Sequence, residues 1–246
     1  MNINNTYFEG SYQHAWKRII PPGLTEAETD LMMEVGGLQT GSRVLDLMCG
    51  YGRHALELGR RSVQVQAIDN LQSYIDEIKA VAAKEHLPVQ AICADVLAVP
   101  LEGLYDAAIC MGNSFAFFNR EDGIKILKNI SAHLKPGGIL LINSWMIAEI
   151  AIRHFKDKEW HEAGEYKCIL DNRFLLHPSR IESEQTIIAP DGRVETITGV
   201  DYIFTLDEME TMFEAAGLQL QSLFSTPRKR QFSFGDTRIY IIAGKS

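Results

Sequence analysis

Between residues 42 and 143, short runs of aliphatic and β-branched residues alternate with stretches of helical periodicity. A strand followed by a helix, repeated several times, is typical of a parallel sheet covered by helices. We expect strands at 43–47, 63–68, 89–93, 105–111 and 139–143, and helices at 53–60, 74–85 and 124–134.

The pattern changes in the second half of the chain. Residues 166–174, 180–188 and 194–204 are expected to form three antiparallel strands, with a turn at Pro190-Asp191-Gly192 between the last two. A helix capped near Thr205 and two final strands, 218–224 and 238–243, complete the core. We therefore predict an α/β fold. Its seven-stranded, mostly parallel sheet has helices on both faces, and a small antiparallel β insertion follows strand five.

Glycines and acids mark the carboxyl ends of the first three expected strands. Gly50 and Gly52 follow the first strand, where the backbone can pass close to a ligand at a helix N-terminus. Asp46 lies at the mouth of that strand, Asp69 ends the second strand, and Asp95 follows the third. An acid about 20 residues after the glycine turn binds ribose hydroxyls in dinucleotide folds.

Asp46 separates two interpretations of the glycine turn. The spacing Gly50-x-Gly52-x-x-Ala55 also fits the fingerprint of nicotinamide-dependent oxidoreductases. A carboxylate at Asp46 would repel the pyrophosphate of their cofactor, most strongly in a partly desolvated cleft. The sequence therefore favours a cationic ligand, and an oxidoreductase is the less favoured alternative.

The segment from Val44 to Ala55 (VLDLMCGYGRHA) closely resembles motif I of class I, Rossmann-like, S-adenosylmethionine-dependent methyltransferases. Residues 134–138 (LKPGG) and 94–100 (ADVLAVP) also resemble segments of that family, and the likeness covers about residues 40–145 and the terminal helix and strands. Met48 departs from it, because the family usually has glycine there. The resemblance implies S-adenosyl-L-methionine as the cofactor, whose ammonium and sulfonium are both cationic.

The resemblance implies cofactor contacts for a set of residues at the strand ends. It places Asp46 near the methionine ammonium, Cys49 and Gly50 at the methionine portion, and Asp69 on the ribose hydroxyls. Asn70 would flank the adenine, Asp95 would accept from its amine, and Val96 would meet the ring edge. Gly52 and Met111 complete the expected cofactor site. The residues alone also allow Asp46 and Asp95 to be helix caps and Asp69 to be a turn acid.

The whole chain is expected to be a single methyltransferase domain. It comprises an N-terminal lid segment (1–24), a cofactor-binding core (25–155), the antiparallel insertion (156–204), and the C-terminal helix and strand pair (205–246). The inserted sheet could cover the site or pair with a second subunit, so a homodimer stays open.

The acceptor is expected beyond the carboxyl ends of the fourth and fifth strands. Expected pocket residues are Asn113, Phe115, Phe117 and Trp145. Residues 112–118 (GNSFAFF) resemble small bacterial methyltransferases, including aminosugar N-methyltransferases, although the two phenylalanines that end this segment also suit a core.

The sequence identifies no catalytic residue with conviction. A hydroxyl or carbon acceptor would benefit from a base, which an amine arriving neutral would not need. His14 and Tyr12 are the candidates, because both lie in the expected lid at residues 7–16. His154, His161 and His177 are alternatives, and each histidine could equally be a surface or structural residue.

Composition limits the remaining function classes. The net charge of −8 disfavours nucleic-acid binding, and the one basic cluster, residues 228–230, is best explained as a solvated turn, with an anchor for a substrate anion as the alternative. The four cysteines have no zinc-type spacing, so no metal is predicted. We expect a cytoplasmic protein with no membrane span and a small-molecule methyl acceptor. A regulator that binds the cofactor without turnover, or an RNA or protein methyltransferase, are the competing functions.

Overall fold

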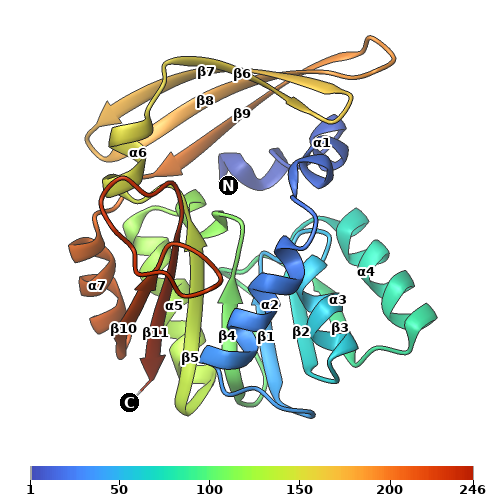
Figure 1. Cartoon of the computed structure of the whole chain (residues 1–246), viewed down its shortest axis with the longest axis vertical. Helices are drawn as coiled ribbons and strands as arrows, with labels where there is room; N and C mark the ends of the chain where they lie inside the picture. The colour runs from blue at the N-terminus through green and yellow to red at the C-terminus, as the bar shows by residue number, and fades with distance from the viewer. Residues whose placement is uncertain (1, 246) are drawn as a thin grey trace.

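A computed structural model describes residues 2–245, and its main sheet confirms the predicted fold class (Figure 1). Seven strands lie in the order β10-β11-β5-β4-β1-β2-β3. All are parallel except β11, which runs antiparallel to its neighbours β5 and β10. The strands are β1 (Arg43–Leu47), β2 (Gln64–Asp69), β3 (Val89–Cys93), β4 (Tyr105–Cys110), β5 (Leu134–Ser144), β10 (Leu218–Phe224) and β11 (Ile239–Lys245).

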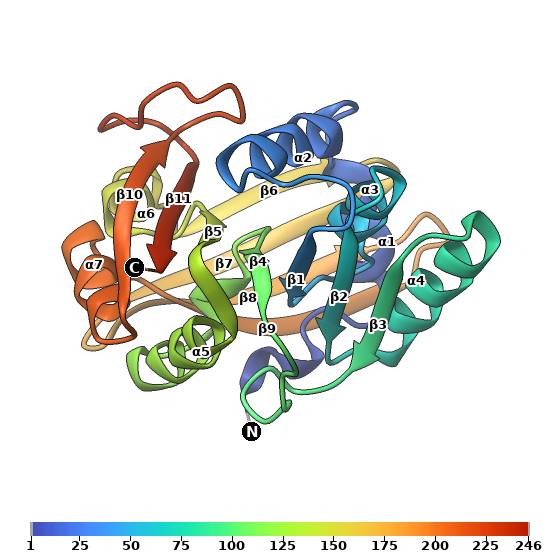
Figure 2. The same ribbon diagram turned by 90° about the horizontal axis from the view of Figure 1, so that it is seen from below.

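Helices cover both faces of this sheet (Figure 2). On β1, Leu45 and Leu47 pack with the helices of one face and Val44 with those of the other, because successive side chains of a strand point to opposite sides. One layer contains α2 (Leu24–Val35), α3 (Arg53–Arg60) and α4 (Gln72–Glu85), and the other contains α5 (Arg120–His133) and α7 (Leu206–Glu214).

A second, antiparallel sheet lies across the carboxyl ends of the core strands (Figure 1). It follows α6 (Ala148–His154) and contains β6 (Lys158–Ala163), β7 (Tyr166–Leu176), β8 (Ser179–Ile188) and β9 (Val194–Tyr202). The sequence predicted three of these strands. It missed β6, because this edge strand is charged and exposed along most of its length and so lacks alternation.

Between the two sheets lies the N-terminal segment, folded as the short 3-10 helix η1 (Ile3–Thr6) and the helix α1 (Ser11–Ile19) (Figure 1). Asn4 joins this segment to β9 of the inserted sheet and to the segment that follows β4. Its side-chain amide donates to the carbonyls of Val200 and Phe117, and its oxygen accepts from the Val200 N–H.

Some predicted element boundaries were wrong, and others are confirmed. Helix α5 begins at Arg120 rather than at 124, because Asn119 caps it by accepting from the N–H of Asp122. The expected start of α7 is confirmed, with a complete capping box between Thr205 and Glu208. Within residues 2–245, no helix has both the length and the hydrophobicity that a bilayer span requires.

Candidate active site

The turn between β1 and α3 opens onto a cavity at the carboxyl ends of β1, β2 and β4. Gly50 has a positive φ of 55°, and a Cβ atom added there would meet no atom within 4 Å. Gly52 has a φ of 75°, and its Cβ would lie 2.5 Å from Cγ1 of Ile78 on α4. The first glycine therefore leaves room for a ligand, and the second lets α3 and α4 pack closely. Met48 also adopts a positive φ, 54°, which explains why glycine suits this position in the related family.

This first cavity brings together eight of the nine expected cofactor residues. They are Asp46, Cys49, Gly50, Asp69, Asn70, Asp95, Val96 and Met111. Gly52 does not line it, because this residue faces α4 instead.

Asp46 presents an unsatisfied carboxylate to the first cavity. The residue is 2% exposed, and its Oδ2 finds no hydrogen-bond partner in the described part of the chain. Burial, together with the neighbouring Asp69, raises the pKa of Asp46 to about 8, although the positive charge of Arg53 opposes this shift. A cationic group in the cavity would supply the missing partner.

The other two acids are already bound to the backbone. The Asp69 carboxylate accepts from the N–H groups of Gly50 (2.8 Å) and Leu71 (3.0 Å), and burial raises its pKa. Asp95 is exposed and accepts from the N–H of Leu97 at 2.9 Å, as a capping acid does. Each carboxylate oxygen has two lone pairs, so both acids can still accept from a ligand.

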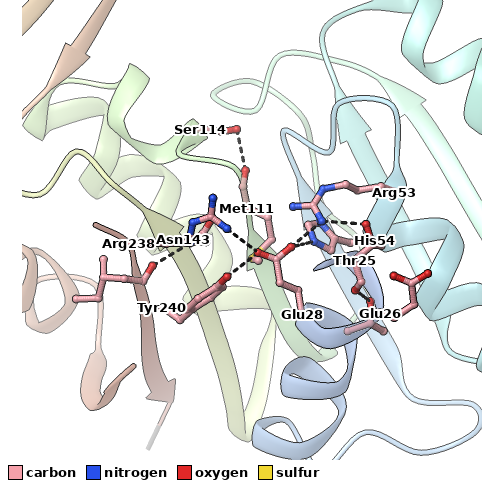
Figure 3. Close-up of polar contacts among 12 residues, drawn as sticks. Thr25, Glu26, Glu28, Arg53, His54, Met111, Ser114, Asn143, Arg238 and Tyr240 are labelled. Carbon is pink, nitrogen blue, oxygen red and sulfur yellow. Dashed lines mark hydrogen bonds and ion pairs between the residues drawn. The ribbon is translucent and has the colours of Figure 1, made fainter. Parts of the chain in front are cut away.

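Glu28 holds two further cavity residues that the sequence did not single out as cofactor ligands (Figure 3). Its fully buried carboxylate lies 2.6 Å from Nη1 of Arg53 and 2.9 Å from Nε2 of His54, and it accepts from the Tyr240 hydroxyl at 2.7 Å. Burial alone would raise the pKa of Glu28, but these three partners outweigh it and lower the pKa to about 2. The position of Arg53 directly after Gly52 could have indicated that it lies at the cofactor site. No sequence pattern indicates a role for Glu28.

A second cavity, of about 550 Å³, lies under the inserted sheet. It is lined by three of the four expected acceptor-pocket residues, Asn113, Phe117 and Trp145. The prediction for Phe115 was wrong, because this side chain is 3% exposed and packs in the core. Both phenylalanines lie on the 3-10 helix η2 (Ser114–Phe117), where residues two apart point in different directions.

The two cavities meet beside the N-terminal segment. Both are lined by Phe8, Trp16, Gly112 and Phe117. Aromatic contacts join the N-terminal segment to the rest of the domain here. The ring centroids of Phe8 and Phe117 lie 5.2 Å apart, and those of Trp16 and Trp145 lie 6.1 Å apart. Residues 7–16, expected to form a lid, thus lie over the junction.

The histidine predicted as the best candidate base does not reach either cavity. His14 is exposed and lines neither cavity, because it lies on the side of α1 that faces solvent. His177 also lines neither, whereas His154 and His161 line the second cavity with exposed side chains. Tyr12, the other candidate, does line the second cavity.

Asp201 on β9 also lines the second cavity and was not predicted from the sequence. Burial raises its pKa to about 7, opposed by a hydrogen bond of 2.9 Å from Nδ2 of Asn113. Asp201 shares its side of the strand with Ile197, Gly199 and Ile203, because residues two apart lie on the same face. An acid on this mostly inward-facing side was the sequence signal that could have identified it.

The basic cluster at residues 228–230 lines neither cavity. Lys229 pairs with Glu34, and Arg230 pairs with Asp236 at 2.5 Å, which fits a solvated turn. Residues 2–245 contain no group of three or more His, Cys, Asp or Glu side chains placed to hold a metal ion.

Comparison with known proteins finds a family match for the region of the chain that forms most of the first cavity. Residues 44–138 match a family model described as a methyltransferase domain. This part of the chain is therefore similar to a methyltransferase domain. The match agrees with the resemblance to methyltransferases that the sequence predicts for about residues 40–145.

Individual relatives extend this result. The chain is 30% identical over 132 residues to a carboxy-S-adenosyl-L-methionine synthase of Geobacter sp. (strain M21), covering 50% of the chain and 53% of that protein. The chain thus spans about half the length of this relative. A dTDP-4-amino-2,3,4,6-tetradeoxy-D-glucose N,N-dimethyltransferase of Saccharopolyspora spinosa is 24% identical, with 80% of each chain covered.

Solved structures confirm the fold over nearly the whole chain. A S-adenosylmethionine-dependent methyltransferase from Clostridium acetobutylicum ATCC 824 is 16% identical, with a TM-score of 0.82 and 96% of each chain covered. An amino pentose methyltransferase from Micromonospora echinaspora is 19% identical, with a TM-score of 0.71 and coverage of 97% of this chain and 98% of the other.

Proposed function

We propose that this protein transfers the methyl group of S-adenosylmethionine to an amino group of a small molecule held in the second cavity. One observation carries the proposal: an acid-lined cavity at the strand ends adjoins a roomier cavity under the inserted sheet, and four residues line both. Such a pair of sites would hold a cofactor and an acceptor in contact, which is the main requirement for a direct displacement.

The first cavity suits the cofactor chemically. Asp46 lines it and has one carboxylate oxygen without a hydrogen-bond partner in residues 2–245, so it would pair with the methionine ammonium. Arg53, held by Glu28, supplies a positive charge for the methionine carboxylate. Asp69 would accept from the ribose hydroxyls, and Asn70, Asp95 and Val96 would surround the adenine. Cys49, Gly50 and Met111 would contact the methionine portion.

When bound there, S-adenosylmethionine supplies an electrophilic methyl group on a sulfonium. The protein's part is to align the acceptor and to exclude water, since a displacement of this kind disperses charge. Phe8, Trp16 and Phe117 are placed to do this at the junction of the cavities. The N-terminal segment, predicted to be a lid, would have to move aside for ligands to enter.

Amines are the favoured acceptors. The relative from Saccharopolyspora spinosa is named for dimethylation of an amino sugar, and the solved structure from Micromonospora echinaspora is that of an amino pentose methyltransferase. A cavity of about 550 Å³ falls within the range of small-molecule sites. The net charge of −8 also disfavours an RNA substrate.

The test is incubation of the purified protein with S-adenosylmethionine and a panel of amino sugars, other primary amines, phenols and alcohols. We expect mass spectrometry to detect a product 14 mass units heavier in the amine reactions, with one S-adenosylhomocysteine formed per methyl group. Cofactor binding without product from any acceptor would favour a regulator instead.

A further inference from the structure

One carboxylate that lines the second cavity, that of Asp201, is partly buried. Two acids line this cavity among the described residues, and Glu159 is exposed, whereas Asp201 is half-buried on the inward side of β9. Apolar and aromatic side chains make up much of the surrounding wall, including Trp145 and Phe117. A carboxylate in such a wall carries a cost that a cationic ligand would offset.

Asp201 lies close to the junction with the first cavity. Its hydrogen bond comes from Asn113, whose neighbour Gly112 lines both cavities. The orientation of Asn113 is unambiguous, because its Oδ1 accepts from the Ser144 hydroxyl (2.8 Å) and the Trp145 N–H (3.2 Å). Its Nδ2 must therefore be the donor to Asp201.

This one hydrogen bond leaves capacity on the carboxylate. In residues 2–245, no donor other than Asn113 is bonded to Asp201, so its second oxygen is available to a ligand. Asn4 fixes the backbone of the preceding residue, Val200, by two hydrogen bonds of 2.8 Å. Asp201 is thus held in place from both sides, which suits a group that must meet a ligand atom.

We propose that Asp201 binds the ammonium group of the acceptor and accepts its proton, which makes it the specificity-determining acid of the second cavity. This inference rests on the proposed function and adds to it the residue that selects amines. In the proton transfer, an N–H bond of the ammonium breaks and an O–H bond forms on the carboxylate. The freed lone pair then forms the new nitrogen–carbon bond while the methyl–sulfur bond breaks, and the proton later leaves Asp201 for solvent.

Other titratable groups of the cavity are less well placed for this role. Burial raises the pKa values of Tyr7 and Tyr12 above their usual range, so they stay neutral and offer an ammonium no negative charge. The Tyr7 hydroxyl is also already used, because it donates to Oε1 of Gln185 at 2.6 Å. The remaining groups are Cys168, Glu159, Lys156, His154 and His161.

The test compares Asp201→Asn with a matched control, Asp171→Asn. Asp171 is an exposed acid on β7 of the same sheet and lines neither cavity. The probe is dTDP-4-amino-2,3,4,6-tetradeoxy-D-glucose, with its 4-hydroxy counterpart as reference, titrated by calorimetry into protein saturated with S-adenosylhomocysteine. Affinity for S-adenosylmethionine, which both variants should retain within about threefold, shows that they are folded.

We expect Asp201→Asn to weaken binding of the amine at least about 30-fold at pH 7, because it removes one partner of a desolvated charge pair. Binding of the hydroxyl reference should change little, and Asp171→Asn should match the wild type. The rate of amine methylation should fall by about 100-fold or more in Asp201→Asn, the usual contribution of a positioned base.

Each outcome has a distinct meaning. A wild-type protein that methylates the amine, with an Asp201→Asn variant that binds and methylates it equally well, would overturn the role of Asp201 and leave the proposed function intact. A wild-type protein that binds S-adenosylmethionine but neither binds nor methylates this amine or any other amine of the panel would overturn both.

Discussion

Binding of S-adenosylmethionine should displace a proton from Asp46 at neutral pH. With a pKa of about 8 in the free protein, Asp46 is protonated in a fraction 1/(1 + 10^(7−8)), about 0.9, of molecules at pH 7. The methionine ammonium favours the ionised carboxylate, so the proton leaves when the cofactor binds. We therefore predict release of about 0.9 proton at pH 7 and about 1 at pH 6.

The same linkage fixes the direction of the pH dependence. Because the pKa of the free carboxyl is raised and binding needs the ionised form, affinity weakens as the pH falls. The ratio (1 + 10^2)/(1 + 10^1) gives about a ninefold loss of affinity from pH 7 to pH 6. The ligand's own α-amino group, with an ordinary pKa near 8, stays largely protonated in this window and contributes little.

Calorimetric titration in buffers with different heats of ionisation measures the number of protons directly. The control is Asp46→Asn, which should release almost none and bind the cofactor more weakly. A wild-type release near zero between pH 6 and 7 would refute the reasoning. An undiminished release in Asp46→Asn would assign the proton to Asp69 instead.

Three further predictions concern residues around the first cavity. Asp69→Ala should weaken S-adenosylmethionine binding at least about 100-fold while the melting temperature stays near that of the wild type, as calorimetry and thermal unfolding would show; unchanged affinity would remove the assignment of the ribose acid. Gly52→Ala should lower the free energy of unfolding in urea by about 2–4 kcal/mol, because it adds backbone strain and a close contact with Ile78. Gly50→Ala should lower it by only about 1 kcal/mol and should mainly weaken cofactor binding. Equal losses of stability in the two variants would contradict the packing of Gly52 against Ile78. Glu28→Gln should cost about 3–5 kcal/mol at pH 7. Since the pKa of Glu28 is lowered from 4.5 to about 2, this stabilisation is present above pH 4.5 and fades toward pH 2, so a difference between variant and wild type that does not shrink at pH 3 would argue against it.

The cofactor side of the site could be predicted from sequence because its determinants are local. The acids lie at the carboxyl ends of neighbouring strands of a parallel sheet, so Asp46 and Asp69 were expected near the glycine turn. The structure brings them into one cavity with Gly50, as expected.

The acceptor side could not be predicted, because its walls come from segments far apart in the chain. Asn4 bonds to Val200 and Asn113 to Asp201, and neither pair shares a sequence pattern. The short 3-10 helix η2, which turns Phe115 into the core, has no distinct periodicity either. Helices α1, α2 and α6 and strand β6 were also missed. Of these, α1, α6 and β6 are short, and short elements depend mainly on contacts with other parts of the fold.

Titration of the purified protein with S-adenosylmethionine, with NAD titrated in parallel, tests the central claim most directly. The charge and shape of the first cavity predict binding of S-adenosylmethionine at micromolar concentrations and no binding of NAD. Binding of NAD, with none of S-adenosylmethionine, would contradict the reading of Asp46 and require the first cavity to be reinterpreted as a dinucleotide site.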